Sequence, residues 1–289
     1  MIETVGLSKR YRDAVALDDV DLSVADGAVY GLVGPNGAGK TTLLALLAGL
    51  RRPTEGTIRV DADPMTVAVL PDTPRFDPWL TGREVVELAG HLVAPGEDRV
   101  TEVVGEAGLS DAIDRRVGGY SRGMLQRLGI ACTLVGSPRV VLLDEPASAL
   151  DPQGRRDVLD LVARLRGSAT VLFSSHILGD VQEVCDTVGI LDAGRLVFEG
   201  PLDDLLVGAA VPRYVVRCRP PVEPVAQRLG MHPWVTEVEV LGTDAVAVGV
   251  ADLADAEERL VGALAEAGAR VVSFGPEAAS LERAFLELT

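Results

Sequence analysis

The sequence predicts an α/β domain followed by a small α+β domain. Three features lead to this expectation: a glycine loop between an apolar run and a helix-compatible segment, two later apolar runs that end in polar side chains, and a change of pattern near residue 212. The chain has 289 residues and a hydrophobic content of 47%, so it can bury one large core and still form a second domain.

The glycine loop is the segment 34–42, GPNGAGKTT. It follows the apolar run 28–33 and precedes the apolar segment 43–50, which is the order of a strand, a loop and a helix. It fits the pattern G-x-x-x-x-G-K-[ST], whose backbone N–H groups can surround phosphate oxygens at the positive end of a helix. The whole loop is therefore a candidate phosphate site: Gly34, Pro35, Asn36, Gly37, Ala38, Gly39, Lys40, Thr41 and Thr42.

The chemistry of the loop explains why a lysine, and not an arginine, occupies position 40. The chain has 27 Lys and Arg residues, of which only two are lysines, Lys9 and Lys40. A compact ammonium can reach between β- and γ-phosphates inside a tight loop, where a planar guanidinium would not fit. Thr41 can then offer its hydroxyl to Mg²⁺, and Thr42 can touch a nearby phosphate.

Charge and apolar pattern restrict the function classes. The net charge of -16 and the pI near 4.6 disfavour binding to DNA or RNA, because a phosphate backbone needs a basic surface. No apolar run approaches the roughly 18 residues of a membrane span, and the start Met1-Ile2-Glu3 lacks the regions of a signal peptide. We therefore expect a cytoplasmic protein that binds no nucleic acid.

Cysteine and histidine spacing gives little support for a disulfide framework or a transition-metal site. The cysteines are odd in number and far apart, which favours reduced core thiols: Cys132, Cys185 and Cys218. The histidines are equally scattered: His91, His176 and His232.

Residues 2–33 predict an antiparallel lead-in to the glycine loop. Strand-like segments at 2–7, 20–24 and 28–33 are separated by turns at Asp18-Asp19 and Asp26-Gly27. Tyr11 is an aromatic residue among cationic neighbours and far from any apolar stripe. Its ring would suit stacking on a planar base, and surface packing is the alternative.

Residues 74–136 predict a helical subdomain inserted after strands at 57–60 and 67–70. Helical periods run over 82–93, 97–107 and 124–135. Within this segment three bulky residues lie on a proline-rich loop, where they would either pack against the helices or form a docking surface for a partner helix: Phe76, Trp79 and Leu80.

The segment Tyr120-Ser121-Arg122-Gly123 directly precedes the helix expected at 124–135. Ser121 can cap this helix, and Gly123 allows close approach of a ligand to the backbone. Like the first loop, the segment could present backbone N–H groups to an anion.

Two buried strands are expected to end in chemically useful side chains. The run 140–143 leads into Asp144-Glu145-Pro146, so Asp144 can hold Mg²⁺ and Glu145 can orient an attacking water; an acidic helix-capping turn is the alternative. The run 169–173 ends in Ser174-Ser175-His176, which puts His176 at the same sheet edge. There a γ-phosphate contact is favoured over a structural role. Residues 148–152, which include Asp151, open the helix between these strands, and a strand at 195–199 ends the domain.

From about residue 212 the elements predict a ferredoxin-like βαββαβ domain. The expected strands are 214–218, 235–240, 245–250 and 270–274, the helices are 222–229 and 254–266, and a last helix follows at 277–288. The segment carries no glycine loop, metal cluster or paired acids, so we expect regulation, dimerisation or docking there. The predicted division is a domain 1–205, a linker 206–211 and a domain 212–289.

Together these motifs resemble the ATP-binding subunit of an ABC transporter over residues 1–205. The motifs occur in the family's order: the loop 34–42, YSRGM with Gln126-Arg127, the strand end 142–146, the segment 148–151 and His176. The YSRGM variant and the added C-terminal domain look most like subunits of ABC-2 type exporters, which move drugs, lipids, polysaccharides or ions. The resemblance implies a P-loop NTPase fold with a mixed sheet core, an antiparallel lead-in and a helical subdomain.

The resemblance also implies roles within one copy of the chain. Tyr11 would stack on the adenine of ATP, and Thr41 and Asp144 would hold Mg²⁺. Glu145 would be the catalytic base, and His176 would hold the γ-phosphate.

Other implied roles involve a second copy of the chain. Ser121 and Gly123 would complete the site of that copy, and Asp151 would link the two sites, so ATP would join a head-to-tail dimer. A helix N-terminus after Ser121 can offset γ-phosphate charge without an arginine finger.

Two motifs depart from the family pattern, at three positions. Arg122 and Met124 stand where the signature usually has Gly and Gln, and Ser121 and Gly123 are retained. Asp72 stands where the family commonly has a glutamine that touches Mg²⁺ and couples to the membrane partner. Aspartate can bind Mg²⁺, but it is shorter and charged.

The expected function is ATP hydrolysis that powers export through separate polytopic permease subunits, with the chain peripheral at the inner face of the cell membrane. The alternative is an ATP-switched soluble module such as the relatives in DNA repair and translation. Those relatives usually have a coiled-coil insertion or two cassettes, and the sequence shows neither. A small-molecule kinase would need an acceptor pocket and lid that the Ser121 loop and His176 do not suggest.

Overall fold

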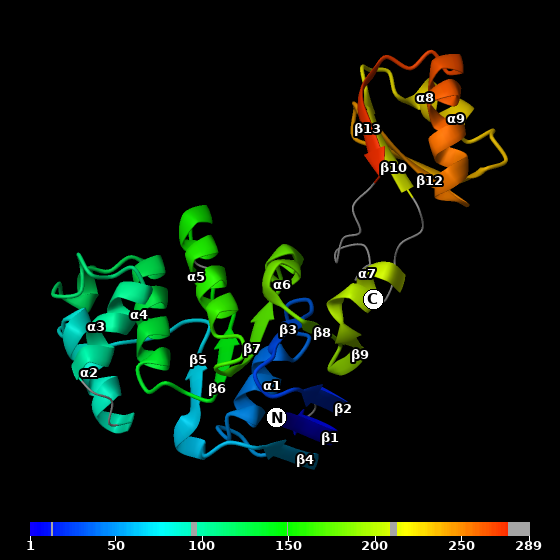
Figure 1. Cartoon of the computed structure of the whole chain (residues 1–289). Coiled ribbons are helices and arrows are strands. Elements are labelled where there is room, and N and C mark those ends of the chain that lie inside the picture. The colour runs from blue at the N-terminus through cyan, green and yellow to red at the C-terminus, as the bar shows by residue number, and fades with distance from the viewer. Residues whose placement is uncertain (13, 94–96, 149, 209–212, 277–289) are drawn as a thin grey trace. The chain divides into compact units, whose positions relative to one another are not determined.

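The computed structural model describes residues 1–12, 14–93, 97–148, 150–208 and 213–276 (Figure 1). These residues divide into a larger unit, Met1–Leu202, and a smaller unit that begins at Asp203. Residues 206–208, which were expected in a linker, belong to helix α7 (Leu202–Gly208), and the rest of that linker lies outside the described residues.

A three-stranded antiparallel sheet begins the larger unit, in the order β2-β1-β4: β1 (Ile2–Tyr11), β2 (Ala14–Val24) and β4 (Glu55–Val60). The expected turn at Asp26-Gly27 is confirmed, but the expected turn at Asp18-Asp19 is wrong, because both residues lie inside β2. Asp19 takes a positive φ of 54°, and its N–H donates to the Ser8 hydroxyl at 3.0 Å, next to a register shift in β1. These residues therefore form a bulge in a continuous strand.

The core of the larger unit is a six-stranded sheet in the order β5-β6-β7-β3-β8-β9, parallel except for the last strand. Strands β3, β6 and β7 are buried along their whole length, as their apolar runs predict. The strands are β3 (Val29–Val33), β5 (Val67–Leu70), β6 (Val140–Asp144), β7 (Thr170–Ser175), β8 (Thr187–Asp192) and β9 (Arg195–Pro201). The predicted α/β class is confirmed.

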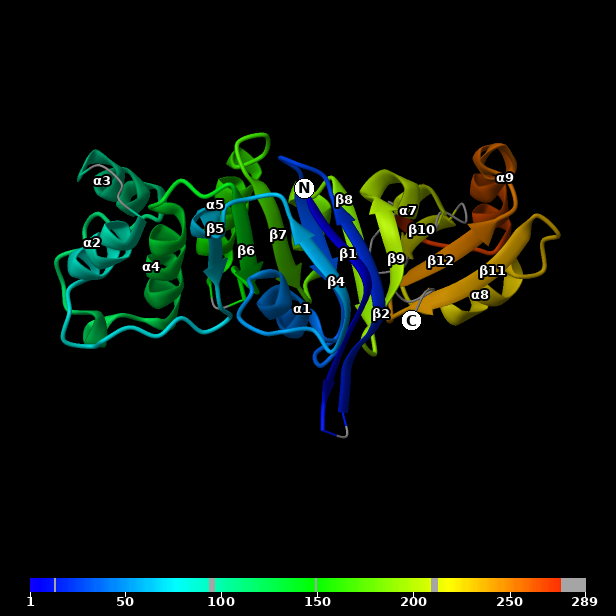
Figure 2. The ribbon, with the colours of Figure 1, turned by 90° about the horizontal axis from the view of Figure 1, so that it is seen from below.

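Helices cover both faces of this sheet (Figure 2). On one face α1 (Lys40–Leu47) packs its leucines between the core strands and the β2-β1-β4 sheet, in a cluster that includes Tyr30 and Leu32. On the other face α6 (Leu178–Val184) lies so close to β3 that a Cβ on Gly31 would collide with Val181. Helix α5 (Pro152–Arg164) packs beside α6. This packing holds the end of β3 in a fixed place.

The helical subdomain contains α2 (Gly82–Val93), α3 (Glu97–Glu106) and α4 (Arg122–Leu134), with a short 3-10 turn η2 (Val117–Gly119) before α4 and another, η1 (Pro64–Thr66), before β5. The Ser121 hydroxyl accepts a hydrogen bond from the Met124 N–H at 3.3 Å, so the predicted cap is confirmed. Trp79 is 65% exposed while Phe76 and Leu80 are half-buried. The expectation that Trp79 packs against the helices is therefore wrong.

The smaller unit has the predicted βαββαβ order and a sheet in the order β11-β12-β10-β13, in which every neighbouring pair is antiparallel. Helices α8 and α9 pack on this sheet around Val216, Leu229 and Leu260. The elements are β10 (Arg213–Cys218), α8 (Glu223–Leu229), β11 (Val235–Leu241), β12 (Ala245–Val250), α9 (Leu253–Glu266) and β13 (Val271–Pro276). The helix expected at 277–288 lies outside the described residues.

The three cysteines are free thiols, as expected. Cys185 and Cys218 are buried, and Cys132 is partly buried. Removal of the Cys132 thiol from water raises its pKa to about 12. Over the described ranges, no group of three or more His, Cys, Asp or Glu side chains could hold a metal ion. Nor does any helix in those ranges have the length and apolar character needed to cross a membrane.

Candidate nucleotide site

A cleft of about 520 Å³ opens at the edge of the core sheet where β3, β6 and β7 end. Because these strands are parallel neighbours, the residues that follow them meet at one edge, which is where open α/β sheets bind ligands. The lining residues are Ala16, Pro35, Asn36, Gly37, Ala38, Gly39, Lys40, Thr41, Thr42, Asp72, Arg122, Asp144, Glu145, Ser148 and His176.

The glycine loop supplies one wall of this cleft, and α1 begins at its end. Gly39 precedes the first helical residue with a φ of 111°, and a Cβ there would lie 2.5 Å from the Ala16 carbonyl oxygen. Only glycine fits this conformation and this approach. The turn aims the unpaired N–H groups of the first turn of α1 at the cleft, so this wall suits an anion.

Lys40 bends back over its own loop. Its ammonium donates to the Gly34 carbonyl oxygen at 2.6 Å and to the Pro35 carbonyl oxygen at 3.2 Å, and it lies 3.7 Å from Oε1 of Glu145. The residue is only 6% exposed, and an ammonium at that depth needs these acceptors. An entering phosphate can replace one or both carbonyl contacts.

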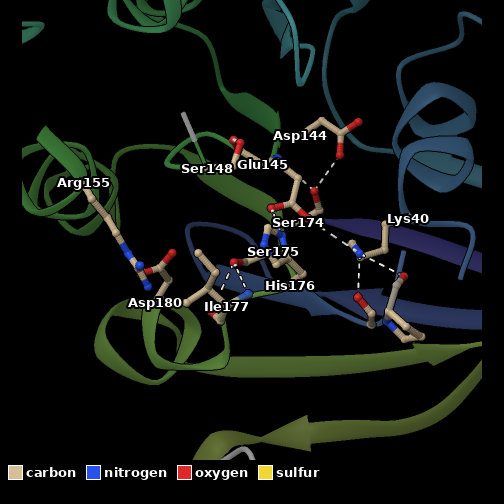
Figure 3. A network of polar contacts seen from close by, with 12 residues as sticks. Lys40, Asp144, Glu145, Ser148, Arg155, Ser174, Ser175, His176, Ile177 and Asp180 are labelled. Atoms are coloured by element: carbon tan, nitrogen blue, oxygen red, sulfur yellow. Dashed lines mark hydrogen bonds and ion pairs between the residues drawn. The ribbon is translucent and has the colours of Figure 1, made fainter. Parts of the chain in front are cut away.

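Asp144 and Glu145 are joined through the hydroxyl of Ser174 (Figure 3). The Ser174 Oγ donates to Oδ1 of the buried Asp144 at 2.6 Å and accepts the Glu145 N–H at 3.0 Å. Glu145 itself has a φ of 49°, which is uncommon for a residue with a side chain. The strained backbone and the Ser174 hydroxyl together hold the two neighbouring carboxylates in different places. The Asp144 carboxylate is buried beside Ser174, and the Glu145 carboxylate faces Lys40 and His176.

His176 contacts Glu145 directly: Nδ1 lies 2.8 Å from Oε2. An ionised carboxylate only accepts hydrogen bonds, so the contact places the imidazole proton on Nδ1. The structure thus brings together Lys40, Glu145 and His176, which come from three separate segments of the chain.

The remaining candidate residues fall into two groups. Asp72, Thr41 and Thr42 line the cleft. The others lie outside its lining: Tyr11, Gly34, Ser121, Gly123 and Asp151. Among these, the Asp151 carboxylate accepts the Gly154 N–H at 3.0 Å and caps α5.

Tyr11 ends β1, and two cations lie near its ring. The Lys9 ammonium lies 5.0 Å from the ring centroid and the Arg51 guanidinium carbon 5.5 Å from it. Both are within the range of cation–π attraction. The residue is 37% exposed, so it is still accessible to a planar ligand.

Sequence reasoning missed Ser174, Ser148 and Arg122 as parts of the site. Ser148 donates from its hydroxyl to the Glu145 carbonyl oxygen at 3.1 Å, and Arg122 lines the cleft. A serine at the end of a buried apolar strand was the available signal for Ser174, because a buried hydroxyl needs a partner.

Comparisons with known proteins agree with one another. The family model described as ABC transporter matches residues 17–148. The daunorubicin resistance ATP-binding protein DrrA3 of Streptomyces coeruleorubidus is 36% identical, with 98% of this chain and 94% of that protein covered.

Two further matches cover about 70% of this chain. The uncharacterized ABC transporter ATP-binding protein YxlF of Bacillus subtilis (strain 168) is 42% identical over 213 residues, with 71% of this chain and 72% of that protein covered. A solved ATP binding subunit of an ABC transporter is 29% identical with a TM-score of 0.67, and the match covers 72% of this chain and 92% of that one.

Proposed function

The chain belongs to the ABC transporter family of ATP-binding ATPases, and on this premise we propose that it hydrolyses ATP between two copies of itself to power export through separate membrane permease subunits. The observation that carries the proposal is the meeting of Lys40, Glu145 and His176 beside the glycine loop. A phosphate-binding loop, a base and a group that holds the base are what phosphoryl transfer to water requires.

The proposed reaction uses this geometry. Glu145 holds a water and accepts its proton while the water oxygen attacks the γ-phosphorus in line with the bond to the β-phosphate. That bond breaks, and ADP leaves with the bridging oxygen. Lys40 offsets the charge of the phosphates, and His176 holds Glu145 before ATP binds and contacts the γ-phosphate afterwards.

The residues of the cleft fit Mg²⁺. Thr41, Asp72 and Asp144 offer one hydroxyl and two carboxylates, the hard oxygen donors that this ion prefers, and all three line the cleft. Mg²⁺ bound there would offset charge on the phosphate oxygens. Asp72 is exposed, so it can turn toward the ion or away from it.

Two copies are proposed because part of the predicted machinery lies outside its own cleft. Ser121 and Gly123 flank the start of α4, and Asp151 precedes α5, yet none of the three lines the cleft of its own chain. In a head-to-tail dimer they would reach the site of the second copy, where the N-terminus of α4 would face the γ-phosphate.

Export through a membrane partner is supported by a relative and by one surface feature. The relative DrrA3 is named for resistance to daunorubicin, which supports export of an organic compound rather than import. Trp79 is largely exposed on the loop before α2, and with Phe76 it offers an apolar surface to a permease helix.

The test uses the Glu145→Gln form, which should bind ATP without turning it over and keep the dimer closed. We would express it in the native host, cross-link gently with ATP present and identify what co-purifies from detergent-solubilised membranes. The matched control is Glu145→Gln combined with Lys40→Ala, which should lose ATP and therefore the dimer. A polytopic membrane protein found only with the first variant supports the transporter; recovery only from the soluble fraction supports an ATP-switched module instead.

A further inference from the structure

Arg122 is the first residue of α4, yet it lines the nucleotide cleft of its own chain together with Lys40, Glu145 and His176. Its neighbours Ser121 and Gly123 do not line that cleft. A long arginine side chain can reach a place that a serine hydroxyl or a glycine cannot. The signature of the family usually has glycine at this position, so this contribution to the cleft depends on the arginine of the YSRGM variant.

The other basic side chains that line the cleft, Lys40 and His176, already have polar partners. The Lys40 ammonium contacts two carbonyl oxygens and faces Glu145, and His176 contacts the same carboxylate. Arg122 is exposed, and in the part of the chain that the structure describes its guanidinium takes part in no hydrogen bond or ion pair. It is therefore available to a ligand without first breaking a contact.

The charge of the cleft favours such a group. The Mg²⁺ proposed above would offset the charge of Asp72 and Asp144, whereas the Glu145 carboxylate would stand beside the terminal phosphate of ATP, and the residues of the cleft that carry positive charge are Lys40 and Arg122. In the proposed complex the N–H groups of the glycine loop would hold phosphate oxygens, and the terminal phosphate would lie beside Glu145, the proposed base. A planar guanidinium can hold two phosphate oxygens at once and offset charge there.

We propose that Arg122 binds the γ-phosphate of ATP held by its own chain, before a second copy closes the site, and so makes the single chain prefer ATP over ADP. The inference rests on the proposed function, because it assigns a further residue to the same nucleotide site. Since ADP has no γ-phosphate, the contact is lost with ADP. Arg122 is then a specificity residue that acts in its own chain, in contrast to the flanking Ser121 and Gly123.

The test measures nucleotide affinity in single chains. Calorimetric titrations with Mg-ATP and Mg-ADP would use the full chain in the Glu145→Gln form, diluted until light scattering gives the mass of a monomer with either nucleotide present. Adding Arg122→Ala should raise the Kd for ATP roughly tenfold, as expected for loss of a charge-assisted contact, and should change the Kd for ADP by less than about twofold. Arg122→Lys should give a smaller rise for ATP, because it keeps the charge but not the paired donors.

The matched control is Arg116→Ala, which removes an exposed guanidinium of the same subdomain that does not line the cleft. It should leave both affinities unchanged. If Arg122→Ala raises the Kd for ATP and the Kd for ADP equally, the proposal is overturned. It is also overturned if the Kd of the monomer for ATP is unchanged and only ATP-dependent dimerisation is weaker. Failure of the parent chain to bind either nucleotide would overturn the proposed function itself. Circular dichroism verifies that each variant is folded. If Arg122→Ala is unfolded, the Kd of Arg122→Lys for ATP tests the proposal instead.

Discussion

Nδ1 of His176 and Oε2 of Glu145 are 2.8 Å apart, while the other oxygen of the same carboxylate lies 3.7 Å from the Lys40 ammonium. The Glu145 side chain is therefore held on both sides. Such a carboxylate needs little rearrangement to receive a water, which is what a general base requires.

Removing the imidazole should uncouple binding from hydrolysis. His176→Ala leaves the glycine loop intact but frees Glu145, so we expect ATP turnover to fall by roughly a hundredfold while the Kd for ATP changes only a few-fold. Steady-state phosphate release and calorimetry measure the two quantities. His91→Ala, a change at an exposed position of α2, is the control and should turn over normally. Unchanged turnover in His176→Ala would remove His176 from the mechanism.

The Ser174 hydroxyl should matter for both stability and metal use. Ser174→Ala deprives the buried Asp144 carboxylate of its donor and the Glu145 N–H of its acceptor, which costs about 1–3 kcal/mol of unfolding free energy. The Mg²⁺ concentration for half-maximal ATPase activity should rise as well, because Asp144 is no longer oriented. Urea denaturation and Mg²⁺ titration measure these effects. Ser168→Ala, at an exposed hydroxyl, should alter neither.

Tyr11 should act through its ring and not through its hydroxyl. If it stacks on adenine, Tyr11→Ala raises the Kd for ATP by roughly five- to fiftyfold and Tyr11→Phe leaves it nearly unchanged. The same variants should show little change in melting temperature without nucleotide. A lower melting temperature for Tyr11→Ala with unchanged ATP affinity would instead mean that the ring serves only to pack Lys9 and Arg51.

Tyr30 should make the protein less stable at high pH. Burial first, and the adjacent Glu199 carboxylate second, raise the pKa of this phenol well above its ordinary value. An unfolded chain loses the phenolic proton near pH 10 while the folded chain keeps it, so the unfolding free energy falls by up to about 1.4 kcal/mol per pH unit above that pH.

Tyr30→Phe isolates this contribution. The variant loses the hydrogen bond to Glu199, 3.0 Å long, and should be about 1 kcal/mol less stable than the parent at pH 8. Above pH 10 the difference should shrink, because only the parent has this phenol to titrate. Urea denaturation from pH 8 to 11 compares the two, and parallel curves over the whole range would contradict the assignment.

Sequence alone determined the features that depend on near neighbours along the chain. The glycine loop, the buried strands β3, β6 and β7, and the cap at Ser121 follow from local backbone preference and apolar period. Each was predictable because its hydrogen bonds or its burial are set within a few residues. The same pattern gave the order of elements in the smaller unit.

Only the tertiary structure decided the features that depend on distant partners. Asp18 and Asp19 look like a turn, but pairing with β1 makes them a bulge, and Trp79 is exposed despite its apolar neighbours. Ser174, from β7, joins Asp144 and Glu145, from the end of β6, because these strands are parallel neighbours. Arg122 reaches the cleft only because the helical subdomain places the start of α4 there. Local sequence determines the backbone structure and the chemical groups of each segment, and packing between distant segments determines which of these groups contact one another.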